Sequence, residues 1–79
     1  MILISVTKLD HAFGRSLKNR RLEKLLSQED LAIASNLSRA YISDLETGKK
    51  DPSLFTVFKL SRGLKIKPSA LIAEVEHAI

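Results

Sequence analysis

The chain has 79 residues, room for one small domain, and 44% of them are hydrophobic, which excludes a disordered tail. It has no cysteine, so disulfides and thiolate metal sites are excluded, in keeping with a reducing cytoplasm. Thirteen basic and nine acidic residues give a net charge of +4, which suits a polyanionic partner, although a merely basic soluble protein fits the charge equally well.

The amino-terminal stretch, residues 1–6, is apolar but too short to span a bilayer or to serve as a signal core. A soluble, cytoplasmic protein that does not enter membranes is therefore expected. Two structures suit this stretch: a short strand at residues 2–6 that pairs across a dimer, or a frayed terminus.

A first helix is predicted to begin at Thr7, with Asp10 completing a capping box, and to run to about Lys24. Apolar residues at helical spacing define its inner face. These residues are Leu9, Phe13, Leu17 and Leu22.

A second, short helix is predicted through Ser35, because Ser27 and Asp30 repeat the capping signal just before it. The apolar pattern then breaks at residues 36–38. A third helix begins near the last of these, Ser38.

The third helix is predicted to end at Gly48, since glycine accepts a left-handed backbone. Two short helices joined by a turn form a helix-turn-helix when three local conditions hold. The helices must approach closely, which Ala32 allows. The turn must accept a positive φ, which Asn36 tolerates. The second helix must dock by apolar residues three apart, and Ile42 and Leu45 supply them.

Two further helices are predicted, each opened by a proline-containing start signal, at residues 51–53 and 67–69. Gly63 is expected to help end the fourth. The inward-facing positions of these two helices are Leu54, Val57, Leu60, Ser61, Leu64, Leu71, Ile72, Val75 and Ile79. The sequence therefore predicts an all-α fold of five helices, forming a single domain over residues 1–79 with its motif at 28–47.

The runs at residues 27–32 and 37–54 resemble the lambda-repressor-like, Xre-type helix-turn-helix family, and the resemblance covers roughly residues 13–72. Within the family, the run at 36–43 is most similar to the small controller proteins of restriction–modification systems, although phage-type repressors and antitoxins carry similar strings. The resemblance implies a lambda-repressor-like DNA-binding domain whose third helix reads the major groove.

The resemblance also implies a role for each residue of the motif. The positions that would face bases are Arg39, Ala40, Ser43 and Asp44. The positions that would hold phosphates are Gln28, Ser38, Tyr41, Lys49 and Lys50. Arg39 is the strongest candidate base reader, because its planar fork matches the O6 and N7 acceptors of guanine. Asp44 either accepts from cytosine N4 or orients Arg39 or another basic side chain.

An ion pair between Arg21 and Glu46 is implied as well, with a structural role between the first helix and the end of the third. Two positions depart from the family pattern, because Leu25 and Asn36 stand where glycines are usual. A left-handed Leu25 would cost about 1 kcal/mol. The alternative is that the first helix ends differently.

A homodimer is predicted, since a single short recognition helix discriminates poorly between sequences. The operator would then have roughly two-fold symmetry, with half-sites about one helical turn apart. Phe55 stands where the family usually has a polar residue, and it either wraps onto the core or joins a subunit interface. The candidate interface residues are Phe55, Leu71, Ile72 and Val75.

Neither a metal, a cofactor nor an enzyme is predicted, because His11 and His77 lack partners at ligand spacing and no serine has a paired base. The predicted function is transcriptional regulation through double-stranded DNA, either by excluding RNA polymerase or by contacting it. The alternatives are an antitoxin that binds a partner toxin and autoregulates its operon, and a protein-interaction module that has lost DNA binding.

Overall fold

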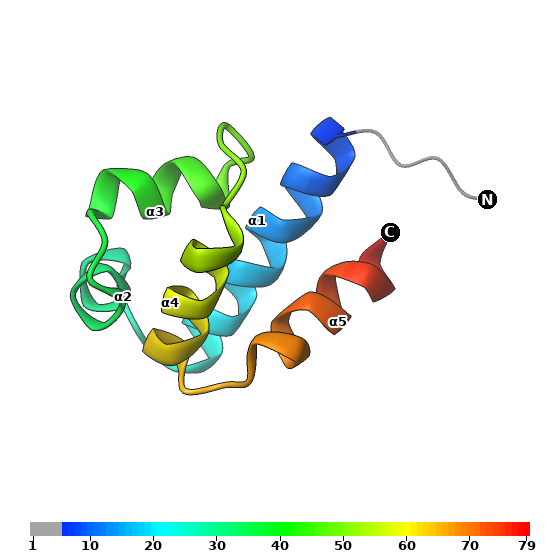
Figure 1. Cartoon of the computed structure of the whole chain (residues 1–79). Helices are drawn as coiled ribbons and strands as arrows, with labels where there is room; N and C mark the ends of the chain where they lie inside the picture. The colour runs from blue at the N-terminus through cyan, green and yellow to red at the C-terminus, as the bar shows by residue number, and fades with distance from the viewer. Residues whose placement is uncertain (1–5) are drawn as a thin grey trace.

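The structure is a computed structural model that describes residues 6–79, with only the backbone described at Val6 and Thr7. Five helices make up this part of the chain, and none of its residues forms a strand, so the predicted all-α class is confirmed. The helices are α1 (Val6–Glu23), α2 (Gln28–Ser35), α3 (Arg39–Glu46), α4 (Leu54–Leu64) and α5 (Pro68–Ala78), arranged as in Figure 1.

Three of the helices have a serine N-cap, whose hydroxyl accepts a hydrogen bond from a backbone amide in the first turn. Ser27 and Asp30 form a complete capping box before α2: the Ser27 Oγ accepts from the Asp30 amide at 2.9 Å, and the Asp30 Oδ2 accepts from the Ser27 amide at 3.0 Å. Ser38 caps α3 and Ser53 caps α4 in the same way from one side only. Pro68 is the first residue of α5, where its missing N–H costs nothing.

Two predicted boundaries are wrong. Helix α1 begins at Val6, so Thr7 lies inside it and does not cap it. For the same reason Val6 is not part of a strand, and residues 2–5 of that predicted strand lie outside the described residues. Gly63 lies inside α4, and the left-handed residue that ends the helix is Lys65, with φ 58°.

Gly63 is needed for packing, because a Cβ there would collide with the Ser35 Oγ. Helix α4 therefore approaches the end of α2 closely. The first helix makes a similar approach: a Cβ on Gly14 would lie 2.6 Å from the Glu46 carbonyl oxygen. These two contacts bring α2 and α3 against α4 and α1 respectively.

The core lies where all five helices meet. Its fully buried larger side chains come from every element: Leu17, Leu31, Ile42, Leu45, Leu60, Leu64 and Leu71. Leu22, predicted to face inward, is half exposed, and Leu9 is 40% exposed at the opposite end of α1. Within the described residues, no helix combines the length and hydropathy needed to cross a membrane.

Candidate nucleic-acid interface

The turn between α2 and α3 depends on a left-handed residue. Asn36 has φ 56° and ψ 47°, and its amide donates to the carbonyl groups of Ala32 and Ile33. The Leu37 amide then donates to the Ala32 carbonyl at 2.9 Å, which closes the end of α2. Asparagine adopts this conformation more readily than other non-glycine residues, so the predicted positive φ is confirmed.

Helix α3 is held on the body by one face and shows the other to solvent. Ile42 and Leu45 have no exposed surface, and they pack near Ala32 of α2, as the spacing predicts. The opposite face carries the four residues predicted to meet bases. Of these, Arg39 and Ala40 are exposed and Ser43 and Asp44 are half-buried. All four lie on one side of the helix, which leaves that side free of the core.

The end of α3 is tied to α1 by the predicted ion pair. The Arg21 Nε donates to the Glu46 Oε2 at 2.6 Å and its Nη2 donates to the Glu46 Oε1 at 3.0 Å. The remaining Arg21 nitrogen, Nη1, donates to the Leu26 carbonyl at 2.9 Å. The Gln28 Nε2 also donates to the Glu46 Oε1, at 3.1 Å. One carboxylate therefore fixes α1, α2 and α3 relative to one another.

This pair is shielded from water, since the side chains of Arg21 and Glu46 are only 9% and 3% exposed. The hydrogen bonds that Arg21 donates to the Glu46 carboxylate raise the pKa of Arg21 further above its ordinary value, so the guanidinium stays charged. Removal of one partner would strand the other charge, which costs about 3 kcal/mol. The structural role predicted for the pair agrees with this burial.

The predicted phosphate contacts lie at the amino end of α2 and at both ends of α3. The Ser38 Oγ accepts from the Tyr41 amide at 3.1 Å, so its own proton is left to donate. Gln28 has one amide hydrogen on Glu46 and a second that remains available. Lys49 is exposed in the turn that follows α3. These positions offer donors, and their contact with phosphate stays a prediction.

Lys50 and Asp44 form an ion pair, and the sequence had left two roles open for Asp44. The Lys50 Nζ lies 3.3 Å from the Asp44 Oδ2 and 5.9 Å from the centre of the Tyr41 ring. Asp44 thus orients a basic side chain, which was one of its two predicted roles. An exposed pair of this kind stabilises the fold by well under about 1 kcal/mol. Its effect is to hold the Lys50 ammonium beside α3.

Tyr41 connects α3 to the start of α4. Its hydroxyl donates to the Thr56 Oγ1 at 3.5 Å, and that oxygen also accepts from the Ser53 hydroxyl at 3.0 Å. Sequence reasoning missed Thr56, because nothing local to the third helix points to a residue fifteen positions further along. The amino end of α4 therefore lies beside the candidate phosphate contacts.

The position expected to hold a glycine after α1 is left-handed: Leu25 has φ 58°, and its side chain is 91% exposed. The strain is thus confined to the link between α1 and α2. Beyond this link, the Gln28 Nε2 donates to the Glu46 Oε1, so the amino end of α2 contacts the end of α3.

The predicted dimer interface needs correction. Leu71 and Val75 are 0% and 5% exposed within the chain's own core, so their side chains have almost no surface to offer a partner. Phe55 and Ile72 are 71% and 45% exposed. Phe55 therefore does not wrap onto the core. Only these two of the four interface residues remain candidates.

A capped helix, a left-handed turn and a docked second helix with an exposed polar face define a helix-turn-helix domain. Residues 17–71 match the family model described as Helix-turn-helix, and the chain belongs to this family. The predicted resemblance to controller proteins is confirmed by the relatives below.

The control protein C.MunI of a Mycoplasma species is 45% identical over 65 residues, covering 81% of this chain and 88% of that protein. The control protein C.BamHI of Bacillus amyloliquefaciens is 41% identical over 61 residues, and the match covers 76% of this chain and 75% of that protein. The crystal structure of the restriction-modification controller protein C.AhdI from Aeromonas hydrophila aligns with a TM-score of 0.77. It is 40% identical and covers 78% of this chain and 94% of that chain.

Proposed function

We propose that the protein is a sequence-specific transcriptional regulator that binds double-stranded DNA as a homodimer, on an operator of roughly two-fold symmetry. The single observation that carries this proposal is the exposed polar face of α3, anchored from behind by Ile42, Leu45 and the buried Glu46. A face fixed so firmly is preorganised for docking in a groove. The similarity to control proteins suggests restriction–modification genes as the target, in the cytoplasm of a bacterium.

Base reading is assigned to the exposed side of α3. The Arg39 fork would bind the O6 and N7 of a guanine, while Ala40 would touch a thymine methyl. Ser43 and Asp44 lie one turn further along the same side of α3 and would contact neighbouring base pairs. Phosphate contacts at both ends of α3 would fix the register without reading sequence.

Regulation would follow from occupying DNA, either by excluding RNA polymerase or by contacting it. An antitoxin would keep the same DNA-binding face, but the control-protein relatives favour the regulator.

The test is a selection of bound duplexes from a random pool, followed by affinity measurements with the Arg39→Ala variant. We expect the selected sites to be roughly palindromic. Loss of Arg39 should cost about 1–3 kcal/mol on a selected duplex and relax the preference at one base pair per half-site. Affinity for random duplex should change far less. An equal loss on both duplexes would refute the base-reading role, and a pool without enrichment would refute sequence-specific binding.

A further inference from the structure

Helix α3 carries one carboxylate on the side that would face bases, at Asp44. The other residues on that side, Arg39, Ala40 and Ser43, are basic or neutral. The Asp44 side chain is 31% exposed, whereas that of Glu46, the other acid of the helix, is 3% exposed. Asp44 is therefore the one negative side chain of α3 that a DNA duplex would meet.

Folding does not account for a carboxylate at this position. Asp44 lies in the last turn of α3, where the partial negative charge of the helix end disfavours an acid, and no basic residue of that turn offsets it. The ion pair with Lys50 is exposed and adds little stability. A negative charge beside a polyanion also weakens binding. The contribution that remains for this carboxylate is to the choice of DNA sequence.

A carboxylate distinguishes bases by what their major-groove edges offer. It can only accept hydrogen bonds, and the base donors in the major groove are cytosine N4 and adenine N6. Guanine presents O6 and N7 there and thymine presents O4, and these acceptors repel a carboxylate. The Asp44 position therefore suits a base with a major-groove amino group. Cytosine fits best, because adenine adds the N7 acceptor beside its amino group.

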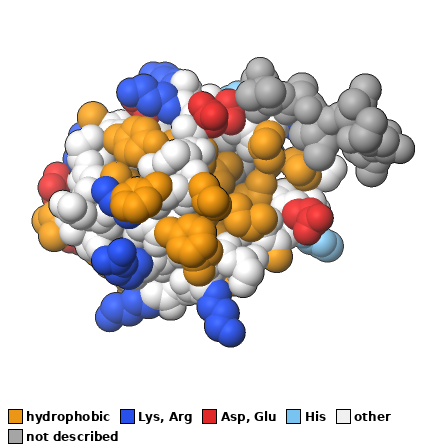
Figure 2. Space-filling model, viewed as in Figure 1, with side chains coloured by type: hydrophobic (Ala, Val, Ile, Leu, Met, Phe, Trp, Pro, Cys, Tyr) orange, Lys and Arg blue, Asp and Glu red, His pale blue; other side chains and the backbone are white. Residues whose placement is uncertain are grey.

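The contact with Lys50 leaves an acceptor for the base. The Lys50 Nζ lies 3.3 Å from one carboxylate oxygen of Asp44, Oδ2, and the second oxygen can accept from a base. An ammonium has three N–H donors, so Lys50 can keep this contact and still donate to a phosphate. Figure 2 shows basic side chains at the upper edge of the molecule, over the turn that follows α3 in Figure 1. The pair thus offsets part of the negative charge without using up the carboxylate.

We propose that Asp44 selects the operator by exclusion: it accepts a base with a major-groove amino group, chiefly cytosine, and lowers the affinity for duplexes that lack one there. The inference rests on the proposed function and names the base class that this position reads. A side chain of this kind raises specificity by penalising wrong sequences. Asp44 follows Arg39 by five positions, or about 7.5 Å of helix, which spans on the order of two base-pair steps.

The first test is the affinity for a random duplex, measured by fluorescence anisotropy at fixed salt. Asp44→Asn removes one negative charge per subunit at nearly constant shape. We expect it to tighten random-duplex binding by about threefold or more, because the repulsion from the phosphates is lost. Circular dichroism checks that the variant is folded. A random-duplex affinity that Asp44→Asn leaves unchanged would overturn the inference.

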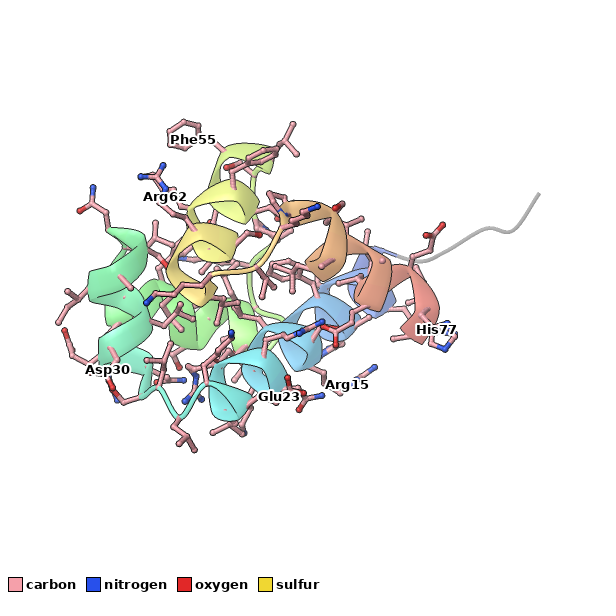
Figure 3. The ribbon with its side chains drawn as sticks, turned by 90° about the horizontal axis from the view of Figure 1, so that it is seen from below. Arg15, Glu23, Asp30, Phe55, Arg62 and His77 are labelled. Carbon is pink, nitrogen blue, oxygen red and sulfur yellow. The ribbon has the colours of Figure 1, made fainter. Side chains whose placement is uncertain are left out.

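The matched control is Glu23→Gln, which removes the same charge from α1. Glu23 is about two and a half helical turns from Gly14, the residue packed against the end of α3, so it points away from α3. Figure 3 shows Glu23 projecting from α1 at the margin of the molecule. Its partner Arg20 keeps a 2.9 Å contact with Glu74. Glu23→Gln should change random-duplex binding far less, and an equal gain would show that only net charge matters.

The second test is selection from a random pool with the wild-type protein, Asp44→Asn and Asp44→Glu. Wild-type sites should carry an amino base, mainly cytosine, about two base pairs from the position that Arg39→Ala relaxes. Guanine or thymine in its place should cost about tenfold in affinity. An amide offers both a donor and an acceptor, so Asp44→Asn should accept any base there. Asp44→Glu keeps the carboxylate and should retain the preference.

The outcomes separate this inference from the proposed function. Wild-type enrichment with the same bases selected by Asp44→Asn would refute exclusion by Asp44 and leave sequence-specific binding standing. Wild-type protein that enriches no site would refute the proposed function, and the base preference with it.

Discussion

Among residues 6–79, three non-glycine residues have a left-handed backbone: Leu25, Asn36 and Lys65. Asparagine tolerates this conformation, but leucine does so only with strain. The Leu25 side chain is 91% exposed, so it recovers little by packing. Its strain is therefore nearly uncompensated.

Leu25→Gly should raise the free energy of unfolding by about 0.5–1 kcal/mol, because relief of the strain exceeds the added chain entropy of glycine in the unfolded state. Urea denaturation measures the change. Leu25→Ala is the control, since alanine keeps the Cβ that causes the strain and should leave stability nearly the same. If alanine stabilised the protein as much as glycine, the destabilising feature would be the exposed leucine side chain and not the left-handed backbone.

The capping box gives α2 a pH dependence. Hydrogen bonds from the backbone amide of Ser27 and with its side chain lower the pKa of Asp30 below its ordinary value. A carboxyl with a depressed folded pKa stabilises fully above its unfolded pKa, near 4, and loses that contribution as the pH falls through the folded value. The stability due to Asp30 should therefore disappear in acid.

We expect Asp30→Asn to lower the melting temperature at pH 6 and to match the wild-type protein near pH 2. Thermal unfolding across this range measures the difference between the two. A difference that persists unchanged at pH 2 would mean that the carboxylate is not the stabilising group.

At this scale, the sequence predicted those residues whose role depends only on their neighbours in the chain. Ser27 caps α2 and Asn36 is left-handed, because each acts on backbone groups within a few positions. The Arg21–Glu46 pair was found through the family resemblance and not by spacing. The Tyr41–Thr56 contact and the Lys50–Asp44 pair depend on how helices and turns pack, and no local pattern could specify them.

At the scale of the elements, α1 and α3 approach so closely that only glycine fits at position 14. A Cβ there would lie 2.6 Å from the Glu46 carbonyl oxygen, which is backbone and cannot rotate away. Gly14→Ala should therefore destabilise the fold by about 2 kcal/mol or more.

The same substitution at an exposed helical glycine raises the free energy of unfolding by up to about 1 kcal/mol. The sign of the measured change therefore shows whether the close approach of α1 and α3 requires a glycine at position 14. Denaturant unfolding gives the stability, and duplex binding shows whether α3 has moved. Gly14→Ala protein that is more stable than wild type would show that the helices can separate without cost.

Glycine also explains why one helix boundary was mispredicted. Gly63 was expected near a helix end, but it allows α4 to pass close to Ser35. A left-handed turn and a close approach both select glycine, and the sequence alone does not distinguish them. Similarly, α5 carries apolar residues on more than one side, and only the packing shows that Leu71 is inside while Ile72 is largely outside.

At the scale of the whole molecule, the net charge of +4 adds a sequence-independent attraction to DNA, and the cations nearest the recognition helix should carry most of it. Lys50 is held there by Asp44 and the Tyr41 ring. Each phosphate contact contributes about 0.9 to the slope of log affinity against log salt, and a dimer has two copies of Lys50.

Lys50→Gln should therefore flatten that slope by about 2 per dimer and weaken selected and random duplexes alike. Fluorescence anisotropy across a salt series measures both effects. Lys67→Gln is the matched control, since Lys67 precedes α5 at the α4–α5 connection, at the end of the molecule away from α3 (Figure 1). If both substitutions flattened the slope equally, the attraction would come from the overall charge, and the turn after α3 would have no special part in it.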